Sequence, residues 1–576
     1  MQRMLLTLLF CMCSTTVFAQ TSVSVDISGV SQPLEENIRL FLSIEQQKDN
    51  ALLSEGRLRR LHKKALAEIT SALQPFGYYR PVVESSLMMV SPERWKARYQ
   101  VDPGPALRIA QLNITISEPM RSDPEFETLL SKLPLHTGDV FDHLLYEKIK
   151  SSLARLAAER GYFNAQFVEH RVEIDLDAYE ARVFLNYEGA VRYRFGEVSL
   201  QQDVLDEDLL RRYIPFETGS PYTLGALIDF QQALNDSDYF RTVEVSPGLA
   251  LADSDEIPVN VSLTPRKRHR YSFGLGYGTD TGARTRLGWQ MPRVNTKGHR
   301  FDSEIRLSQI GYSLSANYRV PVLNPRTDQM IYSAGVINEK TDTSDSTVRT
   351  VGASLKRSRG EWRESISLNY QQEDFIIADT SGDSTLLMPG VSWSRTWGDS
   401  FIYAIDGLRF DISLRGANDK YVSDTSFFQA HGGIKAINTP LRNNRIIARG
   451  SIGSTWTNNF DQLPSSVRFF TGGSQSVRGY GYQTLGPVDA DGDVIGGKYL
   501  MTGSIEFEHY FESKWGAAVF YDAGNAMDDF SDTLARGVGF GLRWQSPIGT
   551  VRIDLASALT LDGNPWRIHI NIGPDL

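Results

Sequence analysis

The sequence is short of cysteine, of positive charge and of long apolar runs, and each shortage excludes a class of protein. Its two cysteines, Cys11 and Cys13, both lie within the first 20 residues. The rest of the chain therefore has no thiol for a disulfide, a thiolate metal site or a cysteine nucleophile. A formal net charge of -9 argues against a nucleic-acid-binding surface. We expect no cofactor, no metal site and no nucleic-acid partner.

Long apolar runs are also missing, because after the first 20 residues no stretch approaches the roughly 18 apolar residues of a membrane-spanning helix. If the protein crosses a membrane, it must do so as a β-barrel. The opening stretch "MQRMLLTLLFCMCSTTVFAQ" places Arg3 before an apolar run and small residues that end at Ala19. This pattern is typical of a secretory signal peptide, so we expect residues 1–19 to be removed and the protein to be exported.

The region before residue 266 contains a repeat. The stretches "RLRRLHKKALAEITSALQPFGYY", "LLYEKIKSSLARLAAERGYF" and "LGALIDFQQALNDSDYF" each carry apolar residues at spacings of three and four, which predicts amphipathic helices. They recur about every 80 residues, and each leads into a short β-rich stretch. We predict three units of strand-helix-helix-strand-strand over residues 20–103, 104–188 and 189–265.

The region from residue 266 to residue 576 alternates with period two. The stretches "YSFGLGYG", "VGFGLRW" and "WRIHINI" place large apolar side chains on one face and glycine or polar residues on the other. Trp and Tyr at the ends of the apolar faces are typical of the membrane interface, and the length of the region fits about 16 strands, an even number. We predict a transmembrane antiparallel β-barrel; a soluble β domain is the alternative, because it alternates as well.

Two barrel motifs carry a resemblance to a known family. The stretch "RFFTGGSQSVRGY" from Arg468 and the stretch "FYDAG" from Phe520, placed after three repeated units, resemble the outer-membrane assembly and secretion superfamily. Its members carry POTRA domains ahead of a sixteen-stranded barrel. The resemblance implies three periplasmic POTRA domains and a barrel in the outer membrane of a Gram-negative bacterium.

The number of units and the ending "NIGPDL" look most like the TamA branch of this superfamily. That resemblance implies a factor, not an enzyme, that assists insertion or secretion of outer-membrane proteins such as autotransporters. It also implies outer-membrane lipids and a TamB-like, inner-membrane-anchored, periplasm-spanning protein as partners. A BamA-like general insertase and a two-partner secretion transporter remain alternatives. From other classes, an outer-membrane hydrolase and a passive porin remain.

The glycine-rich stretch around Arg478 is the first candidate site. Alternation in "MTGSIEFEHY" and "KWGAAVFYDAG" points Glu506 and Asp522 into the lumen, where a loop arginine can bridge two carboxylates with its planar fork. The resemblance implies the same pairing, on a loop folded into the barrel. A solvated loop arginine is the alternative. The predicted loop lock comprises Arg478, Gly479, Tyr480, Glu506, Asp522 and Gly524.

The closing seam of the barrel is the second candidate site. A barrel that inserts other barrels needs an edge whose backbone groups a client strand can pair with. We expect this edge where the first strand, near residues 271–279, meets the last strand, near residues 566–573. Glycines in the first strand weaken its packing there. The predicted seam comprises Tyr271, Phe273, Gly274, Gly276, Ile568, Ile570 and Ile572.

Overall fold

The computed structural model describes residues 22–573 except 51–52, 93, 190, 249–254, 401–402 and 548. The predicted signal peptide, residues 1–19, lies outside the described residues. The chain divides into two compact units, the second of which contains residues 198–215, 229–246 and everything from residue 260 onwards. In the part that is described, no helix is long and apolar enough to cross a membrane.

The first repeated unit is a three-stranded sheet of order β1-β3-β2 covered by helices. Strand β1 pairs in parallel with β3, and β2 pairs antiparallel with it. Helix α3 buries the predicted stripe of Leu58, Leu61, Ala65 and Ile69, and these side chains pack on the sheet. The elements are β1 (Ser22–Ser28), α1 (Gln32–Phe41), α2 (Ser43–Gln46), α3 (Glu55–Leu73), β2 (Val82–Ser91) and β3 (Arg94–Asp102).

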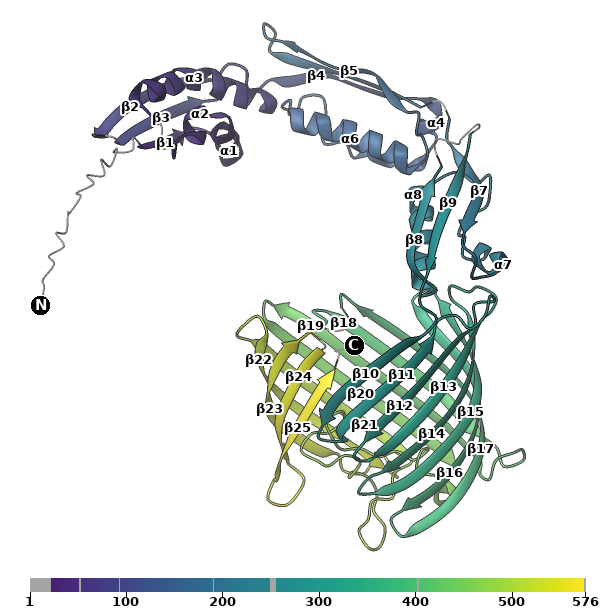
Figure 1. Ribbon diagram of the computed structural model, residues 1–576. Coiled ribbons are helices and arrows are strands. Elements are labelled where there is room, and N and C mark those ends of the chain that lie inside the picture. The colour runs from purple at the N-terminus through teal and green to yellow at the C-terminus, as the bar shows by residue number, and fades with distance from the viewer. Residues whose placement is uncertain are drawn as a thin grey trace, which may run out of the picture. The chain divides into compact units, whose positions relative to one another are not determined.

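The second and third repeated units have the same plan, with sheet orders β4-β6-β5 and β7-β9-β8 (Figure 1). The second unit contains β4 (Arg108–Ile116), α4 (Glu118–Arg121), α5 (Pro124–Ser131), α6 (His143–Glu159), β5 (Gln166–Asp175) and β6 (Glu180–Glu188). The third contains β7 (Arg194–Gln201), α7 (Glu207–Arg211), α8 (Leu224–Asp236), β8 (Phe240–Pro247) and β9 (Glu256–Pro265). The predicted repeat of mixed α and β units is confirmed, and the first two units each carry one additional short helix.

The rest of the chain forms one sheet of sixteen strands, β10 to β25, in which each strand pairs with its neighbours in sequence. The predicted antiparallel barrel of about 16 strands is therefore confirmed within the described residues. Its strands are β10 (Arg270–Gly278), β11 (Gly282–Met291), β12 (Arg300–Ser308), β13 (Gly311–Pro321), β14 (Gln329–Lys340), β15 (Ser344–Arg359), β16 (Trp362–Ile377), β17 (Thr380–Gly398), β18 (Gly407–Ala417), β19 (Phe427–Leu441), β20 (Asn444–Thr457), β21 (Tyr499–Tyr510), β22 (Trp515–Met527), β23 (Ala535–Ser546), β24 (Gly549–Ala558) and β25 (Trp566–Gly573).

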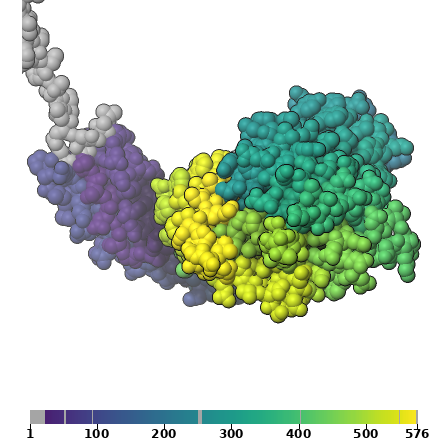
Figure 2. All heavy atoms as spheres, turned by 90° about the horizontal axis from the view of Figure 1, so that it is seen from below, coloured from purple at the N-terminus to yellow at the C-terminus, as the bar shows by residue number. Residues whose placement is uncertain are grey.

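The barrel is uneven in height. Strands β10 and β25, at the two ends of the sheet, have 9 and 8 residues, whereas β16 and β17 have 16 and 19. The ends of the sheet lie side by side, and Figure 2 shows the yellow end of the chain against the teal strands. The barrel is thus shortest where its first and last strands meet.

Candidate functional site at the inner loop and the barrel seam

The segment between β20 and β21, residues 458–498, is here called the inner loop. Two pairs of backbone hydrogen bonds hold it as a folded hairpin: Phe469 exchanges bonds with Gly497 at 3.0 and 2.8 Å, and Thr471 does so with Leu485 at 3.1 and 3.0 Å. Arg478 is only 2% exposed. The inner loop is therefore packed inside the protein, and Arg478 is not a solvated loop charge.

Arg478 pairs with three carboxylates on three different strands. Its Nε and Nη2 donate to the two oxygens of Asp522 at 2.7 and 2.9 Å, and its backbone N–H donates to Asp522 as well, at 3.0 Å. Its Nη1 donates to Glu506 at 2.6 Å and to Asp554 at 3.1 Å. The guanidinium also lies 3.3 Å from the ring centroid of Phe520. The fork of one arginine thus joins β21, β22 and β24.

A second buried arginine shares these carboxylates. Arg543, on β23, donates to Glu506 at 2.7 Å, to Glu508 at 2.9 Å and to Asp554 at 2.6 Å. Arg445, on β20, continues the network with a bond of 2.8 Å to Glu508. Asp554, Arg543 and Arg445 were not among the predicted site residues. All three alternate with lipid-facing neighbours, so the same parity rule identifies them as lumen residues.

The network is electrostatically demanding, because its three arginines and four carboxylates are each at most 5% exposed. Each charge carries a desolvation cost that only its partners offset. Removal of one partner leaves the others buried and unpaired, which destabilises more than the pair itself stabilises. The network therefore makes the position of the inner loop all-or-none rather than gradual.

The two residues after Arg478 fit the wall of the barrel closely. Gly479 has a left-handed φ of 98°, and an added Cβ would lie 2.9 Å from the backbone nitrogen of Ala558. Tyr480 is buried, and its hydroxyl contacts the carbonyl of Arg536 at 3.0 Å and Thr560 Oγ1 at 2.5 Å. Both residues hold the loop against the last three strands.

Gly524, the remaining predicted member of the loop lock, lies on β22 opposite Thr502. An added Cβ there would lie 2.7 Å from the carbonyl oxygen of Met501. None of the described bonds of Arg478 reaches Gly524. The structure thus brings together Arg478, Gly479, Tyr480, Glu506 and Asp522, and leaves Gly524 as a tightly packed position of the neighbouring wall.

The seam between β10 and β25 is nearly free of backbone pairing. Among the described residues, Thr279 N–H donates to Ile570 O at 3.3 Å and Ile570 N–H donates to Thr279 Oγ1 at 3.2 Å, and no ladder joins the two strands. On its other side β25 pairs residue by residue with β24, from Trp566 to Gly573. The sheet is therefore paired along its length and loose at its closure.

The predicted seam residues lie on these two strands. Tyr271, Phe273 and Ile568 are more than half exposed on the outer face, whereas Ile570 and Ile572 are partly buried. An added Cβ on Gly274 or Gly276 of β10 would make only ordinary van der Waals contacts, with its nearest neighbour at 3.7 or 3.8 Å. Neighbouring atoms therefore do not exclude a side chain at these two positions. The glycines instead reduce the side-chain packing of the first strand.

The inner loop also contacts the turn after β10 and the strand β25, one on each side of the seam, which the sequence did not predict. Asp280, just after β10, accepts bonds from the backbone N–H and the Oγ of Ser474 at 2.9 and 2.6 Å. His569 Nε2, on β25, accepts the backbone N–H of Gly479 at 2.9 Å. The alternation of "WRIHINI" places His569 in the lumen, but only the path of the loop shows what it binds.

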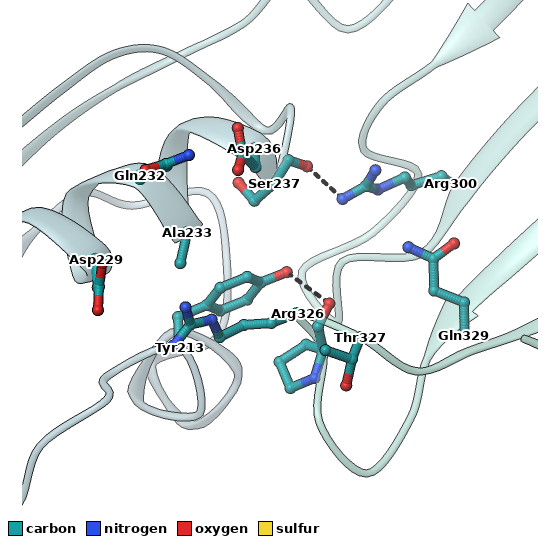
Figure 3. Close-up of a pocket in the computed structure, with 11 residues that line it drawn as sticks. Tyr213, Asp229, Gln232, Ala233, Asp236, Ser237, Arg300, Arg326, Thr327 and Gln329 are labelled. Carbon is teal, nitrogen blue, oxygen red and sulfur yellow. Dashed lines mark hydrogen bonds between the residues drawn. The ribbon is translucent and has the colours of Figure 1, made fainter. Parts of the chain in front are cut away.

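A cavity of about 410 Å³ lies between the end of α8 and two turns of the barrel, all within the second compact unit (Figure 3). Arg300 donates to the carbonyl of Ser237, and its guanidinium lies 4.4 Å from the ring centroid of Tyr239. Burial raises the pKa of the Tyr213 phenol, which stays protonated and donates to the carbonyl of Pro325 at 3.4 Å. These bonds hold segments 198–215 and 229–246 to the barrel turns of the same compact unit.

Comparison with known proteins gives matches over both halves of the chain. Residues 255–575 match the model of the Omp85 superfamily domain. Residues 24–103 match the POTRA domain called TamA domain 1, and residues 122–188 and 193–266 match the POTRA family described as a surface antigen variable number repeat.

Two curated relatives are both named outer membrane protein assembly factor BamA. The protein of Nitratidesulfovibrio vulgaris is 27% identical over 185 residues, which cover 31% of this chain and 23% of the relative. The protein of Neorickettsia risticii is 23% identical over 476 residues, which cover 76% of this chain and 62% of the relative. The chain thus matches less than two thirds of the length of either relative.

Among solved structures, the BamA of Haemophilus ducreyi lacking POTRA domains 1–3 matches with a TM-score of 0.68 and 16% identity. The match covers 80% of this chain and 99% of that one. At this identity the match shows a shared fold.

Replacement of Arg478 tests the loop lock. In Arg478→Ala the carboxylates of Glu506, Asp522 and Asp554 lose a shared partner, so we expect a loss of about 3 to 5 kcal/mol in the stability of the seated loop. We expect the loss of stability in Arg478→Lys to lie between that of wild type and that of Arg478→Ala, because an ammonium keeps the charge but lacks the planar fork. The measurement is protease cleavage of the inner loop in the purified barrel. Arg306→Ala, which removes a largely exposed lumen arginine, is the control. Equal cleavage of Arg478→Ala and wild type would contradict the lock.

Gly479→Ala tests the close approach of the loop to β24. The added methyl group would lie 2.9 Å from the Ala558 backbone, and the alanine would have to adopt a left-handed φ. Gly492→Ala is a matched control, because Gly492 has a similar φ of 93° with nothing within 4 Å of an added Cβ. We expect Gly479→Ala to lower the melting temperature and unseat the loop, and Gly492→Ala to do much less. If the two variants lowered the melting temperature equally, the left-handed backbone conformation alone would account for the loss, and the close approach to β24 would not contribute.

Proposed function

Because the chain belongs to the Omp85 superfamily, we propose that it assists the insertion of β-barrel proteins into the outer membrane, or their secretion across it. The barrel lies in the outer membrane of a Gram-negative bacterium, and the POTRA domains lie in the periplasm. The observation that carries the proposal is the seam, where two strand edges meet with two hydrogen bonds between described residues.

The exposed edges at the seam are what a client strand needs. A strand adds to a sheet by pairing with free N–H and C=O groups of an edge. Every other pair of neighbouring strands in the described barrel is joined by a ladder of at least eight residue pairs. We therefore infer that clients pair at the β10–β25 seam after it separates sideways.

The short strands at the seam favour the same site. A strand of 8 residues is about 27 Å long and, at a tilt of about 40°, spans about 20 Å of the membrane normal. The apolar band of an outer-membrane barrel is about 25 Å tall. Local thinning of the bilayer accommodates a short span, and thinning next to β25 would lower the barrier for a client that inserts there.

The finer identity rests on the first POTRA domain, which matches the TamA type. We infer a TamA-like factor that works with a TamB-like, inner-membrane-anchored partner and has autotransporters among its clients. A BamA-like general insertase and a two-partner secretion transporter are the alternatives within the superfamily. A passive porin is disfavoured because the inner loop packs inside the barrel. An outer-membrane hydrolase remains the alternative from another class.

A disulfide across the seam tests the gate. Thr279 lies opposite Ile570, so in an antiparallel register Tyr277 faces Ile572, and we expect Tyr277→Cys with Ile572→Cys to form a bond under oxidising conditions. Client assembly into proteoliposomes should fall at least tenfold when oxidised and recover on reduction. The matched control is Leu314→Cys with Val336→Cys, a pair already joined in the β13–β14 ladder. Full assembly by the oxidised seam variant would exclude the gate.

Crosslinking in cells tests the partner. Met89 is 55% exposed on β2, an edge strand of the first repeated unit. A photoreactive amino acid at Met89 should capture a large, β-rich, inner-membrane-anchored protein if the TamA-like function is right. Capture of the lipoproteins of the main assembly machine would instead favour the BamA-like alternative.

A further inference from the structure

The inner loop reaches both sides of the seam from within the lumen. On the first side, two consecutive glycines, Gly472 and Gly473, have left-handed φ values of 102° and 97°. They turn the chain so that the N–H and hydroxyl of Ser474 both point at Asp280 Oδ2. Asp280 lies next to Thr279, which makes the seam's backbone bond.

On the last side, the loop binds the residue next to the other partner of that bond. His569 precedes Ile570, is 2% exposed and accepts the backbone N–H of Gly479 through Nε2. This bond assigns the proton of the neutral imidazole to Nδ1. Nδ1 has no hydrogen-bond partner in the described part of the chain and lies 3.9 Å from Asp280 Oδ1. The Asp280 carboxylate therefore stands between the loop and the last strand.

We propose that the inner loop keeps the seam closed by binding on both sides of it, with Asp280, Ser474 and His569 as positioning residues; this set of contacts is called the staple. The Asp280–Ser474 contact is the one that breaks when the seam opens. This inference rests on the proposed function, because it assumes a seam that opens. It adds to the lock around Arg478 a direct hold on both edges of the gate.

The two sides of the staple differ in strength, which decides where it releases. On the last side, Arg478 makes bonds to three buried carboxylates and Gly479 binds His569, all on β21 to β25. On the first side, the contact beside the seam is one carboxylate, 15% exposed, that accepts two bonds from one serine. The first side is weaker, so an opening seam leaves the loop seated on β21 to β25 and frees the β10–β11 turn.

Distance measurement across the seam in the purified full-length protein tests the staple without any client. Nitroxide labels on Leu287→Cys and Ile553→Cys sit on lipid-facing positions of β11 and β24, one strand inside the seam on each side. We expect Asp280→Ala to raise the population of longer distances about tenfold, as loss of a charge-assisted hydrogen bond implies. Ser474→Ala should shift it in the same direction by less.

Two comparisons make the result specific. The double variant Asp280→Ala with Ser474→Ala should match Asp280→Ala alone, because both changes remove the same contact. Glu339→Ala removes another carboxylate that the loop contacts, through Tyr482 and Gln483, but on β14 and away from the seam. Its distances should stay those of wild type. Heat-dependent gel migration checks that each barrel is folded, and Ser474→Ala carries the test if Asp280→Ala does not fold.

The outcomes separate the staple from the proposed function. Unchanged distances in Asp280→Ala and Ser474→Ala, or an equal change in Glu339→Ala, would overturn the staple even if the seam disulfide still blocks client assembly. A shifted population with client assembly unaffected by the seam disulfide would support the staple and contradict the gate function. A shift together with a disulfide block supports both.

Discussion

The pairing of backbone hydrogen bonds inside a bilayer is the constraint on which this structure depends. No water is present in the hydrocarbon layer to bind free N–H and C=O groups, so a membrane sheet must close on itself. In this barrel ladders join each strand to the next from β10 through to β25, and among the described residues the last strand meets the first with two hydrogen bonds. Among the described junctions between adjacent strands, the seam between β10 and β25 is therefore the least paired. In the proposed function a client strand pairs with this edge, and in the proposed staple the inner loop holds the seam closed until then.

The buried ionic network gives the inner loop a single position. Buried charges are a poor source of stability, since well-packed apolar residues often do as well. Their value here is geometric: Arg478 and Arg543 share Glu506 and Asp554, so neither arginine is satisfied unless the strands and the loop are all in place. An apolar plug would tolerate sliding, whereas this arrangement does not. Because the inner loop has a single bound position, its presence in or absence from that position can affect the seam.

Sequence periodicity predicted most of the fold, because the periods of helix and strand are local properties. Parity along β21 and β22 also pointed Glu506 and Asp522 at the lumen, where the structure places them. The same rule applies to Asp554, Arg543 and His569, but their partnership with the loop depends on where a 41-residue segment folds, which no local pattern encodes. Asp280 shows the limit most clearly. It sits in a polar turn after β10, looks like any surface aspartate in sequence, and gains a role only because Gly472 and Gly473 bring Ser474 to it.

The network around Arg478 also bears on how this barrel itself is made. Its members run from Arg445 on β20 to Asp554 on β24, and the loop that carries Arg478 lies between them in the chain. The last quarter of the protein can therefore fold as a curled sheet wrapped around its own loop, with β10 still elsewhere. A loop that had to be threaded into a finished cylinder would face a topological barrier. Since the ionic partners of the loop lie on β20 to β24, we expect this end of the barrel to form around the loop first and the contact with Asp280 to form last.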